Sequence, residues 1–497
     1  MQSYKTIIIG LFVLFFYSLV WAQQPKREMR GVWVATVKNL DWPDKPGLST
    51  EEQKKQIDEI IGHVKSLGMN AVFLQVRPAS DAFYASSAEP WSRYLSGKEG
   101  KAPRPFYDPL KYWIEKAGEN GIDVHAWINP FRVTVKAGEE LSPSHPLAKH
   151  PDWILEYNGK LFLDPGIPQV RKYIKNIVED IVKRYDVAGI HLDDYFYPYP
   201  VNGIEFPDTA SYRLYCDTTK YADKNAWRRD NVNRIVGVLH RTVKSAKPWA
   251  VFGISPFGVW RNSDKDPSGS DTHAGVTNYD MLHADVLTWL KYGWVDYVVP
   301  QIYWNMDHPA AGFRVLSEWW DKNSFEVPVY AGMSIYKVNS GKEAWDNPGE
   351  IPDQIRAVRG LDSFEGEVFF RYAFLKQDLL GLQDSLRYKY YSTIALTPVV
   401  KGNVDIRPLE IKKVRASRKK LKWKIDKNGG RNMKYFVVYS YSQDAVFDPA
   451  DPQWIVTVTK AKHLNLKNIA GGDAKRNYRV SAVDKFGNEG PVSKAVN

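Results

Sequence analysis

The 497 residues of the chain exceed what one compact core usually holds, so we expect two or three domains, one of them a large α/β barrel. Hydrophobic residues make up 44% and charged residues 25% of the sequence, which excludes a disordered or fibrous protein. The formal net charge of +11 is spread along the chain, with one cluster at 415–424, so we expect a solvated surface and no nucleic-acid partner.

The first 22 residues predict a secretory signal peptide. Lys5 precedes an apolar run at 7–20, and Ala22 provides the small residue that a cleavage site requires. The run is too short for a comfortable membrane span, and no Cys follows it for lipid attachment. We therefore expect export to the periplasm or cell envelope with no stable membrane span after cleavage. A retained signal anchor is the alternative.

Cys216 is the only cysteine, which excludes an intramolecular disulfide and argues against a thiol nucleophile or a cysteine metal site. Export without disulfides fits a bacterial periplasm. We expect a monomer that uses no cofactor and no metal.

From about residue 30 to 391, short apolar runs alternate with amphipathic stretches, as in the β–α units of a parallel sheet. The predicted strands are 31–37, 71–77, 123–129, 189–195, 250–255, 297–303, 327–335 and 367–374. The predicted helices between them include 51–67, 170–184, 232–245, 281–292 and 377–388. Eight strands, each followed by a helix, predict a (β/α)8 TIM-type barrel over 28–395.

After Pro398 the pattern changes to short strands separated by turns, with no helix between them. The predicted strands there are 421–425, 435–441, 454–459 and 477–483. The size and alternation predict a small all-β sandwich over 400–497, and the segment 478–484 is similar to fibronectin type III modules. We expect a spacer or docking role for it.

Catalytic residues of a barrel stand at the C-terminal ends of its strands, and alternate residues of a strand share one face. On this basis we predict a ligand-binding site at this end of the barrel whose binding residues are Arg77, His125, Trp127, Asn129, His191, Tyr195, Gln301, Tyr303, Trp304 and Arg371. The two tryptophans are candidate stacking platforms for sugar rings. Each of these side chains also fits ordinary barrel packing.

Asp193 and Asp194 at the end of the fourth predicted strand are the candidate catalytic residues. Adjacent buried carboxylates repel each other, which raises the proton affinity of one of them, as a general acid requires. In a regular strand the two side chains point to opposite sides, so Asp193 is the expected inward acid and Asp194 the assisting one. The alternative is a pair that only caps the strand through backbone amides.

His125 and His191 allow a second interpretation. With Asp193 they are able to bind a divalent metal, which would indicate a metal-dependent polysaccharide deacetylase. They are as readily explained as hydrogen-bonded structural histidines. A further alternative is a glycan-binding protein without catalysis. Nucleotide and serine-hydrolase functions are disfavoured, because no Gly-rich phosphate loop or Gly-x-Ser-x-Gly motif is present.

The sequence resembles the glycosyl hydrolase-like family 10 proteins from about residue 28 to 339. The motifs that carry the resemblance occur in order at the early strand ends: RGVWV at 30–34, NLDWP at 39–43, QVRP at 75–78, HAWINP at 125–130, DDYFYP at 193–198, GISPFG at 253–258 and PQIYW at 300–304. The resemblance implies a bacterial envelope glycosidase acting on peptidoglycan glycan strands stripped of their peptides.

The fourth strand also has a distant likeness to family 18 chitinases, which read Asp-Gly-Ile-Asp-Leu-Asp-Trp-Glu there. Asp193 aligns with the last Asp of that motif, but Tyr195 stands where the acid Glu would be. The chitinase mechanism therefore does not transfer simply. A substrate with acetamido groups is able to supply its own nucleophile. Otherwise the second carboxylate comes from Asp194 or from one of the loop acids Asp81, Asp164, Glu205 and Asp307.

Overall fold

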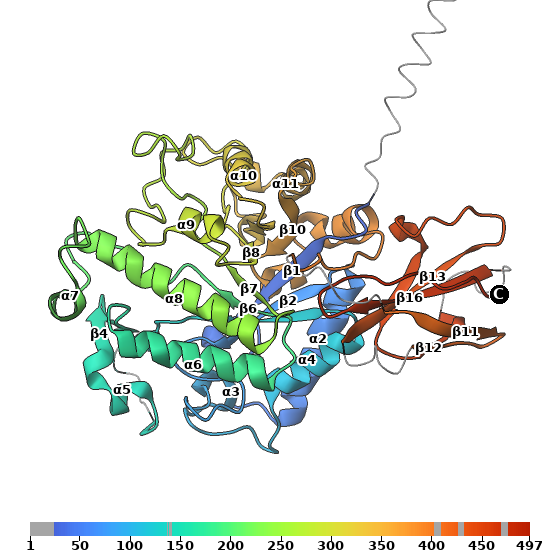
Figure 1. Ribbon diagram of the computed structural model, residues 1–497, viewed down its shortest axis with the longest axis horizontal. Helices are drawn as coiled ribbons and strands as arrows, with labels where there is room; N and C mark the ends of the chain where they lie inside the picture. Colours follow the sequence, from blue (N-terminus) through green and yellow to red (C-terminus); the bar gives the residue numbers. More distant parts are fainter. Residues whose placement is uncertain (1–23, 137, 139–141, 402–408, 426–431, 469–475) are drawn as a thin grey trace, which may run out of the picture.

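The computed structural model describes residues 24–136, 138, 142–401, 409–425, 432–468 and 476–497. Eight parallel strands close into a barrel in the order β1-β10-β9-β8-β7-β6-β3-β2 (Figure 1), which confirms the predicted fold. These strands are β1 (Met29–Val34), β2 (Ala71–Arg77), β3 (Asp123–Ile128), β6 (Gly189–Leu192), β7 (Val251–Ile254), β8 (Tyr297–Val298), β9 (Val329–Met333) and β10 (Phe364–Phe369). The predicted signal peptide at 1–22 lies outside the described residues.

A helix follows each barrel strand and covers its outer face. The main helices are α2 (Thr50–Ser66), α4 (Pro109–Glu119), α6 (Pro168–Arg184), α8 (Lys224–Ala246), α9 (Val286–Lys291), α10 (Phe313–Lys322), α11 (Glu350–Val358) and α12 (Tyr372–Lys376). Shorter elements in the loops are α3 (Arg93–Ser96), α5 (Pro146–Lys149), α7 (Thr209–Tyr215), α13 (Leu382–Ser385) and the hairpin β4 (Ile154–Tyr157) with β5 (Lys160–Leu163). No helix in the described part of the chain is long and apolar enough to cross a bilayer.

Local sequence explains where α2 begins and which face it buries. Ser49 accepts a hydrogen bond from the Glu52 amide, and the Glu52 carboxylate accepts one from the Ser49 amide, which is a capping box. One apolar face of the helix then packs against the strands, with Ile57, Ile60, Ile61 and Val64 buried. The strand β2 is buried along its whole length, as expected between a helix layer and the barrel interior.

Several predicted elements differ from the structure, among them two helices and one strand. The predicted helix at 281–292 is reduced to α9, and the one at 377–388 is broken into a turn at Leu379–Gly381, α13 and a π-helical turn at Leu386–Tyr390. The predicted strand at 297–303 ends after two residues in β8, close to Pro300, which has no N–H to donate.

The C-terminal residues form two three-stranded antiparallel sheets, in the orders β11-β12-β15 and β14-β13-β16. Their strands are β11 (Ile411–Ser417), β12 (Lys420–Ile425), β13 (Met433–Ser442), β14 (Ile455–Thr459), β15 (His463–Asn465) and β16 (Arg476–Asp484). The sheets enclose a common core that includes Leu421, Trp423, Phe436, Val438 and Val480. The fibronectin type III identity and the domain limits 28–395 and 400–497 stay predictions.

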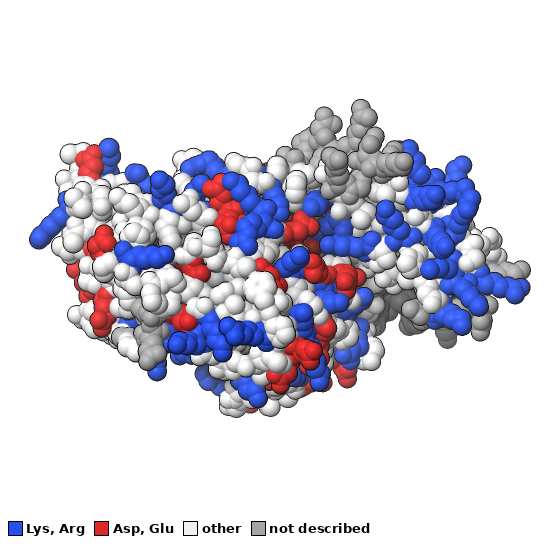
Figure 2. All heavy atoms as spheres, turned by 90° about the horizontal axis from the view of Figure 1, so that it is seen from below, with Lys and Arg blue, Asp and Glu red and all other residues white. Residues whose placement is uncertain are grey.

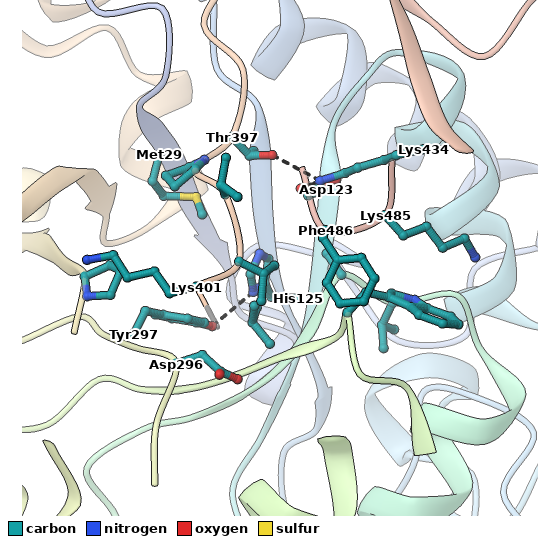
Figure 3. A pocket seen from close by; sticks show the side chains of 18 of the residues that line it. Met29, Asp123, His125, Asp296, Tyr297, Thr397, Lys401, Lys434, Lys485 and Phe486 are labelled. Atoms are coloured by element: carbon teal, nitrogen blue, oxygen red, sulfur yellow. Dashed lines mark hydrogen bonds and ion pairs between the residues drawn. The ribbon is translucent and has the colours of Figure 1, made fainter. Parts of the chain in front are cut away.

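The sandwich lies against the barrel floor, the end at which the strands begin (Figure 1). Lys434 pairs with Asp123 at the start of β3 at 2.5 Å, and the Phe486 ring lies 6.2 Å from the Trp249 ring. A cavity of about 500 Å³ remains between floor and sandwich, lined among others by Asp123, Tyr297, Lys434 and Phe486 (Figure 3). This cavity is at the opposite end of the barrel from the predicted acid pair.

Candidate active site

Asp193 and Asp194 lie just beyond the fourth barrel strand, because β6 ends at Leu192. The alternation of sides along a strand therefore stops before the two acids, and both side chains are buried, with exposures of 5% and 3%. In the barrel β6 lies beside β3, with Trp127 opposite His191. Asn129, which follows β3, is thereby brought next to Asp193.

Three donors surround the Asp193 carboxyl group. The Asn129 side-chain amide donates to Asp193 Oδ2, and Trp127 Nε1 lies 3.4 Å from the same oxygen. The Tyr195 backbone amide donates to Oδ1 at 3.3 Å. Of the predicted binding residues, Trp127, Asn129 and Tyr195 are therefore in contact with the candidate acid, and Trp127 contacts it through its N–H.

Burial raises the pKa of Asp193 to about 7, with the neighbouring charge of Asp194 acting in the same direction. The Arg132 guanidinium and the hydrogen bonds from Tyr195 and Asn129 offset part of this rise. Burial also raises the pKa of Asp194, against hydrogen bonds from Tyr199 and Gln301 that favour its charged form. Because the two groups are coupled, their protons belong to the pair, and one carboxyl is protonated near neutral pH.

A chain of amide contacts fixes the orientation of Asn129. Gln75 Nε2 donates to Asn129 Oδ1 at 2.7 Å, so the Asn129 amide nitrogen must face Asp193. The other end of Gln75 accepts hydrogen bonds from the Thr36 and Val37 amides at 3.0 and 2.9 Å. Gln75 is fully buried, and it links the loop after β1 to the candidate acid.

Gln301, Tyr303 and Trp304 form the side of the mouth after β8. Gln301 Nε2 donates to the Ser255 carbonyl oxygen at 3.0 Å and also reaches Asp194. The half-buried Tyr303 ring lies 5.8 Å from the Phe370 ring, and the half-buried Trp304 ring lies 5.5 Å from the Phe257 ring. The structure thus places all three at the mouth as predicted from strand position, and their sugar-binding role stays a prediction.

Two residues of the mouth were missed from the sequence. Tyr199 donates its hydroxyl hydrogen to Asp194 Oδ2, although it lies in a loop that strand periodicity does not reach. Arg132 lies in the loop after β3, with its guanidinium carbon 5.7 Å from the centre of the exposed Tyr195 ring. Its position two residues after the HAWINP motif was the available signal for it.

Two arginines do not occupy the positions predicted for them. Arg77 is enclosed below a β-bulge, where its guanidinium forms a bidentate pair with Glu89 at 2.6 and 2.8 Å. Arg371 pairs with Asp41 at 2.7 Å, and this contact joins the loop after β1 to the end of β10. Because carboxylates of the chain itself hold both side chains, their geometry does not support a substrate-binding role.

His125 and His191 lie inside the barrel, below the mouth. His125 Nδ1 and His191 Nδ1 lie 3.0 and 3.1 Å from the Tyr297 hydroxyl oxygen, and His191 Nε2 lies 3.1 Å from Ser255 Oγ. Burial lowers the pKa of both imidazoles. Within the described ranges no three His, Cys, Asp or Glu side chains are grouped as metal ligands, so His125, His191 and Asp193 do not assemble the site considered above.

The loop acids considered as the second carboxylate are engaged elsewhere. Asp81 and Asp164 accept hydrogen bonds from backbone amides two residues away. Glu205 and Asp307 pair with arginines at 3.2 and 3.4 Å. Asp194 is therefore the acid that the structure brings to Asp193.

Comparison with known proteins shows the family to which the chain belongs. The sequence profile of the family described as Glycosyl hydrolase-like 10 matches residues 28–347. Glycosyl hydrolase YngK of Bacillus subtilis is 39% identical over 510 residues, covering 98% of this chain and 97% of the relative. Glycosyl hydrolase DigH of Escherichia coli is 37% identical over 380 residues, covering 71% of this chain and 85% of the relative. A solved structure of the PgaB (BpsB) glycoside hydrolase domain from Bordetella bronchiseptica aligns with a TM-score of 0.46 and 14% identity, covering 72% of this chain and 99% of that one.

Proposed function

This chain belongs to the Glycosyl hydrolase-like 10 family and is a glycoside hydrolase, and from that premise we propose that it is exported and hydrolyses peptide-free peptidoglycan glycan strands. The observation that carries the proposal is the buried Asp193–Asp194 pair at a mouth that also presents aromatic and amide side chains. Such a mouth suits a polymer of acetamido sugars, whose rings offer apolar faces and whose substituents offer hydrogen-bonding groups.

In this proposal Asp193 is the general acid. We place its proton on Oδ1, because Oδ2 accepts two hydrogen bonds, from Asn129 and Trp127, whereas Oδ1 accepts one, from the Tyr195 amide. Oδ1 transfers the proton to the glycosidic oxygen as the bond to the anomeric carbon breaks. The carboxylate left behind keeps its hydrogen bonds to Asn129 and Trp127 and the nearby charge of Arg132. The water that completes the hydrolysis forms a bond from its oxygen to the anomeric carbon and gives one proton to this carboxylate, which restores the acid.

Asp194 is the assisting carboxylate. Hydrogen bonds from Tyr199 and Gln301 support its charged form beside the protonated Asp193. A negative charge there stabilises the positive charge that develops at the anomeric carbon, or orients the substrate's acetamido group as the internal nucleophile. Both roles require Asp194 to stay ionised while Asp193 carries the proton.

The test uses the mature protein, Asp193→Asn and Asp194→Asn on four polymers: amidase-treated peptidoglycan strands, intact peptidoglycan, chitin and α-glucan. We expect fragments of the disaccharide repeat from the stripped strands alone, a loss of at least about 100-fold with Asp193→Asn, and unchanged melting temperatures. Mass spectrometry identifies the products. Asp307→Asn serves as the control, because Asp307 is exposed and pairs only loosely with Arg314.

Three outcomes would contradict the proposal. A fully active Asp193→Asn protein removes the assigned acid, and equal cleavage of chitin removes the proposed substrate. Release of acetate without shorter strands would instead establish a deacetylase. For the export part, mass spectrometry of the protein recovered from the envelope should show that the chain begins near Gln23.

A further inference from the structure

Arg132 is a cation at the mouth that forms no ion pair with any carboxylate of the described residues. Its Nε donates to the Pro78 carbonyl oxygen at 2.7 Å, and Ser80 Oγ donates to the Arg132 carbonyl oxygen at 3.0 Å, so both backbone and side chain are held. Its Nη2 is buried and has no hydrogen-bond partner among the described residues. An unpartnered buried donor is unfavourable, and on a permanently charged guanidinium it is more so.

Three other enclosed arginines of the barrel are neutralised by carboxylates of the chain itself. Arg77 pairs with Glu89 at 2.6 Å, Arg228 with Asp208 at 2.6 Å and Arg371 with Asp41 at 2.7 Å. In the described part of the chain no carboxylate lies within ion-pair distance of Arg132. The charge of Arg132 lowers the pKa of Asp193 and of Asp194, but neither carboxyl group forms an ion pair with it. Arg132 as a whole is only half-buried, so its guanidinium, which no carboxylate of the described residues neutralises, can pair with an anion that is not part of the protein.

The side chains around Arg132 indicate which kind of molecule carries that anion. The Tyr195 ring, 39% exposed, lies under the guanidinium, and the Tyr195 amide contacts the candidate acid. An anion bound by Arg132 is thus held next to the bond that Asp193 protonates. A planar guanidinium binds a carboxylate with well-defined geometry, and the ring beside it offers an apolar face to a sugar.

Building on the proposed function, we propose that Arg132 binds the carboxylate on the lactyl group of a muramic acid residue next to the scissile bond. That carboxylate is free only after the stem peptide has been removed, because in an intact strand it is an uncharged amide. Arg132 then makes the enzyme specific for stripped strands through the charge of the free carboxylate, in addition to the smaller size of a strand without stem peptides. Chitin, which has no such carboxylate, lacks this contact.

The experiment compares stripped strands with the same strands whose carboxylates are converted to methylamides. Wild type should lose about 10- to 100-fold in kcat/KM on the amidated strands, the range expected for one charge-assisted contact. Arg132→Gln should be as slow on stripped strands as wild type on amidated ones, and should not distinguish the two substrates. Arg132→Lys should recover part of the preference, because it restores the charge without the planar fork. Arg314→Gln is the control, since Arg314 is an exposed arginine on α10.

Each outcome decides a different point. If Arg132→Gln loses the same factor on both substrates and its pH profile moves, Arg132 acts only on the acid pair and the proposal is overturned. Equal rates of wild type on both substrates overturn it too, even where Arg132→Gln fails to fold. Absence of cleavage of any peptidoglycan-derived strand is instead a failure of the proposed function itself.

Discussion

Asp193 carries a proton near neutral pH because of its immediate surroundings. Burial and the charge of Asp194 raise its pKa to about 7, while the hydrogen bond from Asn129 lowers it. An acid must be protonated to act, so the fraction of active enzyme falls as the pH rises through this pKa. The role of Asn129 can be measured through the same pKa. Its side-chain amide donates to Asp193 Oδ2, the oxygen that does not carry the proton, and so favours the ionised acid.

We therefore expect log kcat/KM to fall with a slope of −1 above about pH 7, where Asp193 loses its proton, and to fall again at low pH, where Asp194 becomes protonated. Asn129→Ala removes a hydrogen bond that favours the charged acid, so the high-pH limb should move to higher pH while the maximal rate decreases. Rates measured from pH 5 to 9 in one mixed buffer check both points. A limb that moves to lower pH in Asn129→Ala would be incompatible with the assigned hydrogen bond.

At the scale of elements, Arg77 and Glu89 hold three segments together. Arg77 donates to the carbonyl oxygens of Asn129 and Pro130 after β3, and Glu89 accepts from Tyr173 of α6 at 2.8 Å. The loop that carries Asn129 is thus fastened from below by groups that do not touch substrate. The ion pair that stabilises the fold therefore also fixes the position of the loop that carries Asn129.

Arg77→Met should lower the free energy of unfolding by about 3–5 kcal/mol, because Glu89 is left buried and charged without its partner. Adding Glu89→Gln should recover much of this loss, since the uncompensated charge is removed. Urea unfolding measures the change, and KM of the folded fraction should stay within about twofold of wild type. A raised KM at unchanged stability would instead support the substrate-binding role first predicted for Arg77.

At the scale of the whole molecule, the sandwich closes the end of the barrel opposite the mouth. Lys434 pairs with Asp123 and Lys485 with Asp186, so ion pairs hold the two parts in one arrangement. The basic cluster expected at 415–424 lies on the exposed faces of β11 and β12, and Lys and Arg gather over the sandwich in Figure 2. The docked position supports a structural contribution to the barrel in addition to the predicted spacer or docking role.

Lys434→Met should lower the stability of the protein by about 1–3 kcal/mol, because Asp123 loses its partner in a largely buried interface. Cleavage should be unchanged, since Asp123 and Asn129 stand at opposite ends of β3, roughly 20 Å apart at 3.3 Å per residue. Calorimetry and the strand-cleavage assay measure the two effects. Lys413→Met, on the exposed face of β11, is the control and should melt like wild type.

The barrel, its eight strands and the strand end that carries the acid pair could all be predicted from the sequence. Strand periodicity and the motifs at the strand ends are local properties, so they are readable without the fold. Counting alternate residues placed Trp127 and Asn129 correctly, because β3 is regular as far as Ile128. The same count separated Asp193 from Asp194 because it assumed that the fourth strand continued beyond Leu192.

Which polar strand-end residues remain free of intramolecular partners could not be predicted, because it depends on the packing of distant segments. Arg77 forms an ion pair with Glu89, and Arg371 forms one with Asp41. The Tyr297 hydroxyl is hydrogen-bonded to His125 and His191. These partners are mostly distant in sequence, and they meet because barrel closure makes particular strands and loops neighbours. The same closure leaves Arg132 beside the acid pair without an ion-pair partner among the described residues. A charged side chain does not reveal in sequence whether the fold will neutralise it, because that depends on which other segment is packed against it.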